Sequence, residues 1–139
     1  MRFFVLFLYF LIAATDAGVI IPGNTAVVKG SEIKDEGIAA GITTDIHSHK
    51  VVMYSKTYCP YSRKLKIILS RYPINDLKVI ELDRQKEMKN MQRILKRMTG
   101  RSTVPQLFID GEFIGGHDDT KVIEDRGELR QILMKAKAL

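Results

Sequence analysis

The feature that most constrains the fold is a lone cysteine between a β-rich run and a proline that opens a helix. Residues 50–55 read KVVMYS, which predicts a short buried strand. Pro60 is favoured at a first helical position and precedes an amphipathic helix that reaches Arg71. A second strand is expected over residues 77–82. A strand, a helix and a strand in this order imply a parallel pair with a right-handed crossover.

The remaining elements extend this unit on both sides. Asp110-Gly111 indicates a tight hairpin, and Gly100 is expected to end the helix before it. Further strands are expected at residues 105–110 and 112–115. Helices are expected at residues 31–47 with Ser31 as N-cap, and at 87–98, 120–125 and 128–138. The predicted fold class is therefore α/β, with a four-stranded mixed sheet flanked by helices.

The first residues have the layout of a secretory signal peptide. Arg2 precedes an unbroken apolar run of 12 residues, 3–14, and small residues precede a cleavage position after Ala17. The run is shorter than the roughly 20 residues that span a bilayer. An uncleaved signal anchor and a cytosolic protein with a buried N-terminal helix are the alternatives. We expect a signal peptide or anchor at 1–17, a linker at 18–32 and a folded domain at 33–139.

This organisation implies the secretory pathway, either the endoplasmic reticulum or Golgi lumen, or secretion from the cell. A membrane is expected as a partner only if the N-terminal segment stays uncleaved. The formal net charge of +6 raises the question of nucleic acid. The basic residues of 84–97 spread along an amphipathic helix as a solvated face, and no nucleic-acid motif accompanies them. No nucleic-acid partner is expected.

Cys59 is the only cysteine in the chain, so it cannot form an internal disulfide. Its place before Pro60 puts the sulfur at a helix N-terminus, where unpaired N–H groups and the helix dipole favour a thiolate. Lys56, Arg63 and Lys64 favour it further. Ser62 can donate a hydrogen bond to the thiolate but cannot attack a disulfide, so an external thiol must resolve any bond made on Cys59. The alternative is a buried, unreactive cysteine.

Two later stretches could supply a pocket for that thiol. A cis Val104–Pro105 bond would leave the Val104 backbone free to pair with an extended peptide. Gly115-Gly116 permits close backbone approach. Asp118 and Asp119 follow at a helix start, where they can cap the helix and hold an ammonium group.

Together, KTYCPYS at 56–62, TVP at 103–105 and GGHDD at 115–119 resemble the signature of the glutaredoxins. The resemblance covers roughly residues 33–139. It is to the classical-type branch, because no insertion separates Lys56 from the cysteine motif, and it has a monothiol CPYS site in which Ser62 replaces the second cysteine. The apolar N-terminal segment resembles that of secretory-pathway monothiol glutaredoxins of fungi. The resemblance implies a thioredoxin fold and a glutathione site.

The resemblance also implies a role for each site residue. Cys59 would be the catalytic nucleophile. The residues implied in glutathione binding are Lys56 and Gln92 at the glycine carboxylate, Tyr61 lining the site, Thr103, Val104 and Pro105 at the cysteinyl part, and Gly116, Asp118 and Asp119 at the γ-glutamyl end. Gln92 is matched only by its spacing to Thr103.

The expected function is a glutathione-dependent thiol–disulfide oxidoreductase that reduces or forms protein–glutathione mixed disulfides by a monothiol mechanism. Its partners would be glutathione and glutathionylated proteins, and it would act as a monomer. The alternative is a dimer that shares a [2Fe–2S] cluster through two Cys59 thiolates and two glutathiones, against which Pro60 argues mildly. A third reading is a catalytically silent, membrane-anchored module. His47, His49 and His117 are spaced too irregularly to indicate a metal site.

Overall fold

A four-stranded mixed sheet forms the centre of the molecule. The computed structural model describes residues 30–139, so the expected signal peptide and most of the expected linker lie outside the described residues. The strand order is β2–β1–β3–β4. β1 (Val51–Ser55) pairs in parallel with β2 (Leu77–Glu81) and antiparallel with β3 (Gln106–Ile109), which pairs antiparallel with β4 (Glu112–Gly115). The predicted mixed sheet is confirmed.

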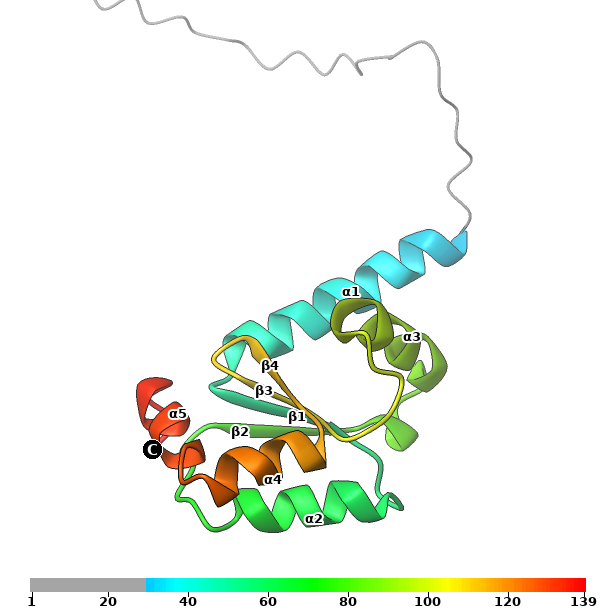
Figure 1. Cartoon of the computed structure of the whole chain (residues 1–139). Helices are drawn as coiled ribbons and strands as arrows, with labels where there is room; N and C mark the ends of the chain where they lie inside the picture. The colour runs from blue at the N-terminus through cyan, green and yellow to red at the C-terminus, as the bar shows by residue number, and fades with distance from the viewer. Residues whose placement is uncertain (1–29) are drawn as a thin grey trace, which may run out of the picture.

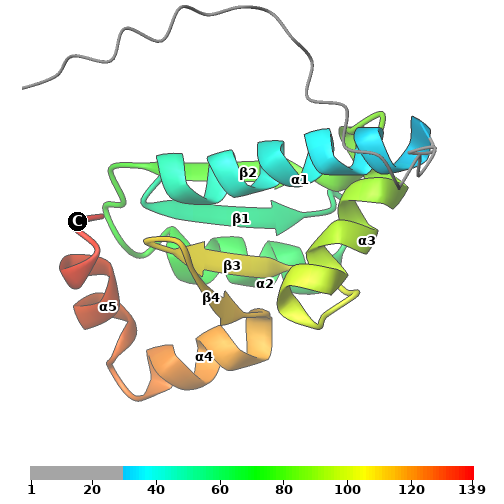
Figure 2. The same cartoon turned by 90° about the horizontal axis from the view of Figure 1, so that it is seen from above.

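Helices cover both faces of this sheet, as Figures 1 and 2 show. α1 (Gly30–Ser48) and α3 (Met88–Thr99) lie on one face. α2 (Pro60–Leu69), α4 (His117–Asp125) and α5 (Leu129–Lys135) lie on the other. A short 3₁₀ turn, η1 (Leu82–Arg84), joins β2 to the loop before α3.

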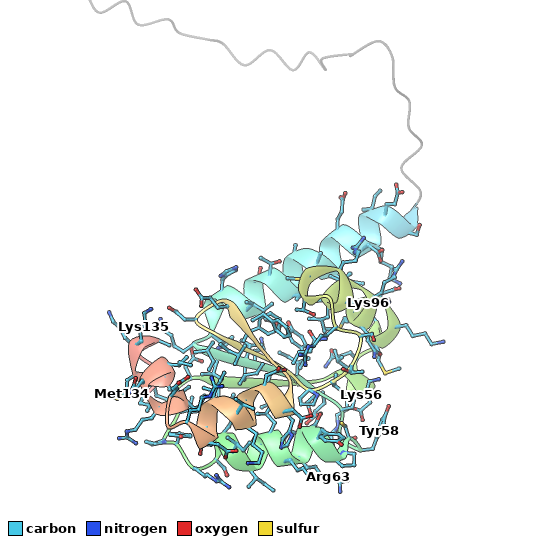
Figure 3. The ribbon with its side chains drawn as sticks, in the orientation of Figure 1. Lys56, Tyr58, Arg63, Lys96, Met134 and Lys135 are labelled. Atoms are coloured by element: carbon cyan, nitrogen blue, oxygen red, sulfur yellow. The ribbon has the colours of Figure 1, made fainter. Side chains whose placement is uncertain are left out.

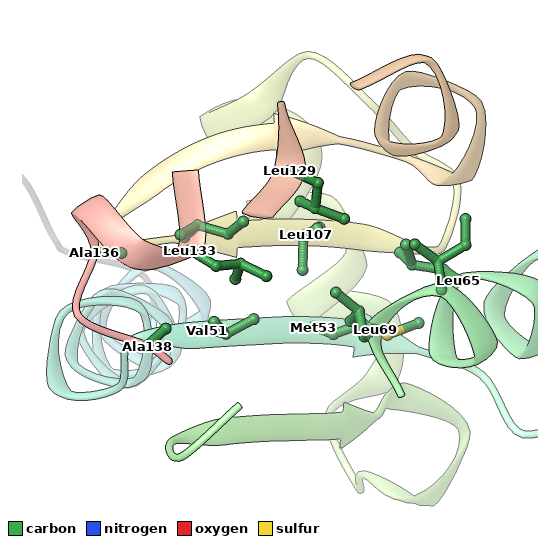
Figure 4. Close-up of a cluster of buried hydrophobic side chains, with 11 residues drawn as sticks. Val51, Met53, Leu65, Leu69, Leu107, Leu129, Leu133, Ala136 and Ala138 are labelled. Carbon is green, nitrogen blue, oxygen red and sulfur yellow. The ribbon is translucent and has the colours of Figure 1, made fainter. Parts of the chain in front are cut away.

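The central strand β1 is buried on both faces, which explains its unbroken apolar sequence. Val51 and Met53 point into the core under α2 and α5, which Figure 4 shows. Val52 and Tyr54 point into the second core under α1 and α3. The loop that carries Cys59 begins at the end of β1, so its first residue is held by the packing of β1 against the cores on both faces of the sheet.

α1 runs against the direction of β1, so its first residues lie at the end of the sheet where β1 and β2 finish. Asp45, near the end of α1, pairs with Lys78 at the start of β2 at 2.7 Å. Lys34 pairs with Glu87 at 2.7 Å, beyond the end of β2. We call the end of the molecule where β1 and β2 finish the active-site end, because Cys59 lies there.

The structure shifts some predicted boundaries. α1 begins at Gly30, inside the segment expected as linker 18–32, so Ser31 lies within the helix and is not its N-cap. The pairs of Lys34 with Glu87 and of Asp35 with Arg93 hold this first part of α1 against α3. α5 ends at Lys135 rather than Ala138. Over residues 30–139, no helix is both long enough and apolar enough to cross a membrane.

The second half of α1 is part of the core, and this predicts a contrast within one helix. Ile46 is 3% exposed, whereas Ile33 is 60% exposed. Ile46→Ala should lower the free energy of unfolding by about 2–5 kcal/mol, because it removes a packed side chain and leaves a cavity. Urea unfolding followed by circular dichroism measures this. Ile33→Ala is the control and should change it by less than about 0.5 kcal/mol; equal losses would contradict the assignment of α1 to the core.

Candidate active site

Cys59 is the N-cap residue of α2, as the sequence predicts. Its backbone is extended, with φ −78° and ψ 119°, and Pro60 follows as the first helical residue. The Cys59 carbonyl accepts the first bond of the helix, from Arg63 N at 3.2 Å. The side chain is partly exposed. The sulfur therefore sits at the positive end of the helix, within reach of solvent.

The surroundings of the sulfur lower the pKa of the Cys59 thiol. Partial burial raises that pKa, but the Ser62 hydroxyl, the backbone N–H groups of Ser62 and Tyr61, and the positive charge of Lys56 together outweigh burial. All four groups favour the charged form of the sulfur. Low-pKa, accessible thiols are the reactive ones, so the unreactive-cysteine alternative is not supported by this geometry.

The Ser62 hydroxyl is completely buried and has no hydrogen-bond partner of ordinary geometry. It nevertheless contributes to lowering the Cys59 pKa. Both observations agree if the hydroxyl turns its hydrogen toward the sulfur only when the sulfur is charged. A buried hydroxyl without a partner costs free energy, and the thiolate offers it one.

Asp83 fixes the loop that leads to the cysteine, a role the sequence analysis missed. Its carboxylate accepts a bond from Thr57 N at 3.0 Å and another from the Thr57 hydroxyl. The hydroxyl bond and then the backbone bond of Thr57 lower the pKa of Asp83. The one available sequence signal was position: Asp83 directly follows a parallel strand, at the edge where β1 also ends.

Lys56 and Gln92 meet in the structure although they are far apart in sequence. Lys56 Nζ donates to Gln92 Oε1 at 3.1 Å, and Gln92 Nε2 donates to Ser102 O at 2.7 Å. Gln92 thus joins the Cys59 loop to the loop before Pro105. The two side chains expected at the glycine carboxylate thus lie side by side.

The loop before β3 approaches Cys59 from the other side. The Val104–Pro105 peptide bond is cis. Cys59 Sγ lies 3.7 Å from the Val104 carbonyl oxygen, to which the thiol donates a weak hydrogen bond. A backbone edge therefore runs beside the sulfur.

Gln106 holds that loop and was also missed by the sequence analysis. Its side chain is buried, and its amide nitrogen donates to Arg101 O at 2.8 Å and to Thr103 O at 3.1 Å. Its amide oxygen accepts from the Thr99 hydroxyl at 3.0 Å. One buried amide thus binds both ends of the segment before Pro105. A glutamine in a strand gives no local signal of such a role.

A cleft of about 280 Å³ opens next to the sulfur. It lies near the lower end of the volumes of small-ligand sites. Its lining includes six of the predicted site residues: Tyr61, Thr103, Val104, Pro105, Gly116 and Asp118. Arg101 and His117 complete it. Lys56 and Gln92 do not line this cleft and belong to the α3 side of the loop.

The two aspartates of the GGHDD stretch are in different states. Asp119 accepts from Gly116 N at 2.9 Å and pairs with Arg101 at 2.7 Å. The Gly116 N–H lowers the pKa of Asp119, and the Arg101 charge lowers it further against the opposing effect of burial. Asp118, whose side chain is 87% exposed, contacts the His117 ring at 2.7 Å. The Asp118 carboxylate is therefore available to an ammonium group of a ligand, whereas the Asp119 carboxylate is engaged at the N-terminus of α4.

Gly115 and Gly116 are required for backbone approach, as expected. Gly115 has φ +130°, and a side chain there would collide with Asp119. A Cβ on Gly116 would lie 3.3 Å from Pro105 O and 3.2 Å from the Arg101 guanidinium. The two glycines let the start of α4 close against the loop that carries Pro105. Among residues 30–139, no three His, Cys, Asp or Glu side chains gather as metal ligands would.

The chain matches known proteins over the part that forms this site. The family model described as glutaredoxin matches residues 51–114. An uncharacterised monothiol glutaredoxin from Caenorhabditis elegans is 59% identical over 98 residues, which are 70% of this chain and 67% of that protein. A monothiol glutaredoxin from Oryza sativa subsp. japonica is 37% identical over 95 residues, covering 68% and 72%. The chain belongs to the glutaredoxin family.

Solved structures agree with the predicted thioredoxin fold. Oxidised glutaredoxin 2 from Chlamydomonas reinhardtii superposes with a TM-score of 0.72 at 38% identity, covering 76% of this chain and 98% of that one. A buckwheat glutaredoxin–glutathione complex superposes with a TM-score of 0.74 at 30% identity, covering 78% and 97%. In this glutaredoxin the single cysteine fits a monothiol member of the family.

The buried Ser62 hydroxyl of this glutaredoxin leads to a prediction about the reactivity of Cys59. Ser62→Ala removes a donor that stabilises the thiolate, so the pKa of Cys59 should rise. The rate of alkylation by iodoacetamide, measured against pH, should therefore shift to higher pH. Ser70→Ala is the control, because the Ser70 hydroxyl bonds Ile67 O at the far end of α2. An unchanged profile for Ser62→Ala would show that the hydroxyl does not support the thiolate.

Proposed function

We propose that this protein is a glutathione-dependent thiol–disulfide oxidoreductase that acts on protein–glutathione mixed disulfides by a monothiol mechanism. One observation carries the proposal. The sole cysteine has a lowered pKa, lies at a helix N-terminus, and contacts the Val104 carbonyl oxygen, and Val104 lines a small-ligand cleft. The glutathione complex of the buckwheat relative supports glutathione as the ligand.

Glutathione would lie across this cleft in one orientation. Lys56, with Gln92 beside it, offers a positive charge to the glycine carboxylate. Thr103, Val104 and Pro105 offer the backbone edge to the cysteinyl part, and Tyr61 also lines the cleft. At the γ-glutamyl end, Asp118 offers an exposed carboxylate to the ammonium group, while Gly116 and Asp119 shape the backbone around it. Such contacts would hold the glutathione sulfur in line with Cys59.

The reaction then proceeds in two thiol–disulfide exchanges. The Cys59 thiolate attacks the glutathione sulfur of the mixed disulfide, the old S–S bond breaks, and the protein sulfur leaves as a thiolate. Cys59 then carries glutathione. A second glutathione thiolate attacks that glutathione sulfur, which releases glutathione disulfide and restores the Cys59 thiolate. The client thiol is released in reduced form, one glutathione thiol is oxidised, and it leaves as glutathione disulfide together with the glutathionyl group that came from the client. In an oxidising compartment the reverse sequence adds glutathione to client thiols.

The second proposed role is a [2Fe–2S] cluster shared by two chains. Residues 30–139 hold one cysteine, so four sulfur ligands would require two Cys59 thiolates and two glutathiones. The partly exposed Cys59 sulfur at the molecular surface fits that donor set. Pro60, fixed as the first helical residue, remains the argument against close approach of a second chain.

The first test uses release of glutathione from a glutathionylated peptide, with residues 18–139 and glutathione as reductant. We expect turnover that Cys59→Ser abolishes, because no other thiol exists in the chain. Folded Cys59→Ser protein that keeps near-normal turnover would overturn the mechanism. Folded wild-type protein without turnover would overturn the enzyme proposal, and visible absorbance after anaerobic purification would then favour the cluster.

We also propose, from residues 1–17, that the protein enters the secretory pathway. These residues lie outside those that the structure describes. N-terminal sequencing of the protein expressed in eukaryotic cells should read from Gly18 if the signal is cut after Ala17. An uncleaved chain in the membrane fraction would support the anchor instead, and an uncleaved cytosolic chain would contradict both.

A further inference from the structure

The active-site end carries basic side chains that the proposed glutathione site does not use. Lys89 and Lys96 lie three residues before and four residues after Gln92 on α3, so the three share one face of the helix. Gln92 accepts a hydrogen bond from Lys56, which places this face beside the loop that leads to Cys59. Figure 3 shows Lys96, Lys56 and Arg63 on the same side of the molecule.

A second group of exposed side chains flanks the sulfur on α2 and the loop before it. Tyr58 is 63% exposed and Tyr61 is 52% exposed. Arg63 is exposed, and the Lys64 ammonium lies 5.2 Å from the centre of the Tyr61 ring. We call Arg63, Lys64, Lys89 and Lys96 the basic rim. Its α2 half follows Cys59 in the first turns of α2, and its α3 half shares a helix face with Gln92, which binds Lys56 of the Cys59 loop.

The rim is not neutralised from within the described part of the chain. None of its four members makes an ion pair with another described residue. On the same two helices, by contrast, Lys66 pairs with Glu81, and Arg93 pairs with Asp35. The four cations of the basic rim therefore remain available to an external negative charge.

The carboxylates near Cys59 are already engaged. Asp83 accepts two bonds from Thr57, and Asp119 is held by Gly116 N and Arg101. Asp118 is exposed and contacts the His117 ring, which lies 5.6 Å from the Tyr61 ring, so one carboxylate remains on the α2 side. Four unpaired cations outnumber this carboxylate, so the surface that a client meets is positive in balance.

We propose that the basic rim selects client proteins whose glutathionylated cysteine is flanked by acidic residues. The proposal rests on the proposed function. The mixed disulfide must reach Cys59, so the client chain on either side of it must pass over the rim. Acidic side chains there would be attracted by Arg63, Lys64, Lys89 and Lys96, while the two exposed tyrosines would contact the backbone between them. A flat anionic membrane would meet the same charges but presents no mixed disulfide to the sulfur.

The test compares three glutathionylated peptides of equal length, with acidic, neutral or lysine residues around the cysteine. At low ionic strength we expect kcat/KM for the acidic peptide to exceed that for the lysine peptide about tenfold, through faster association. The preference should largely disappear at about 0.5 M salt, because the exposed charges are then screened. The mixed disulfide of free cysteine with glutathione, which has no flanking residues, should be turned over equally at both salt concentrations.

A matched pair of variants locates the effect. Lys89→Glu with Lys96→Glu should lower kcat/KM for the acidic peptide about tenfold and raise it for the lysine peptide. It should leave the cysteine–glutathione substrate unchanged, which also shows that the protein is folded. Arg130→Glu with Lys135→Glu makes the same change in net charge on α5, at the other side of the molecule in Figure 3, and should change nothing.

The possible results distinguish a failure of the basic-rim proposal from a failure of the proposed oxidoreductase function. Equal rates for the three peptides, with the small substrate still turned over, would overturn the rim and leave the oxidoreductase standing. If the two double variants have equal effects, the preference comes from the net charge of the protein and not from the basic rim, which would also overturn the proposal. Equal peptide rates with rim-dependent binding to phosphatidylserine vesicles would assign the rim to a membrane instead. If the wild type turns over no substrate, the proposed function itself fails.

Discussion

The rest of the site depends on the interaction between the Cys59 sulfur and the N-terminus of α2. As a thiol, the sulfur is a weak donor to the Val104 carbonyl oxygen, 3.7 Å away. As a thiolate it can only accept, so that contact is lost, and the N–H groups of Tyr61 and Ser62 and the Ser62 hydroxyl become its partners. Ionisation therefore exchanges one hydrogen bond for others, from groups that already surround the sulfur. It also leaves the Val104 edge to whichever ligand next occupies the cleft.

Three loops must keep their positions around the sulfur for these hydrogen bonds to form. Each loop is held by one polar side chain from a neighbouring element. Asp83 holds the loop before Cys59, Gln106 holds the segment before Pro105, and Asp119 holds the turn into α4. None of these bonds lies within a helix or strand ladder. Functional loops are mobile unless a rigid scaffold positions them. Here the scaffold is the end of the sheet, where β1 and β2 finish and β3 begins.

The sequence predicted the parts of this arrangement that leave a local pattern. Pro60 after a buried strand predicted the helix and the place of the sulfur, and Asp110-Gly111 predicted the hairpin, in which both residues have positive φ. Asp83 and Gln106 left no such pattern. The Thr57–Asp83 bond joins residues that meet only after the parallel pairing of β1 with β2 has formed. Asp118 and Asp119 were both expected to cap the helix and to hold an ammonium group, and the sequence did not distinguish them; in the structure Asp119 binds the N-terminus of α4 and Arg101.

In the proposed cycle the Cys59 site must be accessible twice, first to the mixed disulfide of the client and then to a second glutathione. A second cysteine at position 62 would attack from inside the fold, because that position is completely buried. With serine there, the second attack must come from solvent, along the line of the bond that has just formed on Cys59. The sulfur is correspondingly placed at the surface, between exposed Tyr58 and Tyr61. In the proposed cycle, the opening that admits a second glutathione would also leave the flanks of a client chain in contact with the basic protein surface. Access for the resolving thiol and selection among clients would then depend on the same exposed surface around Cys59.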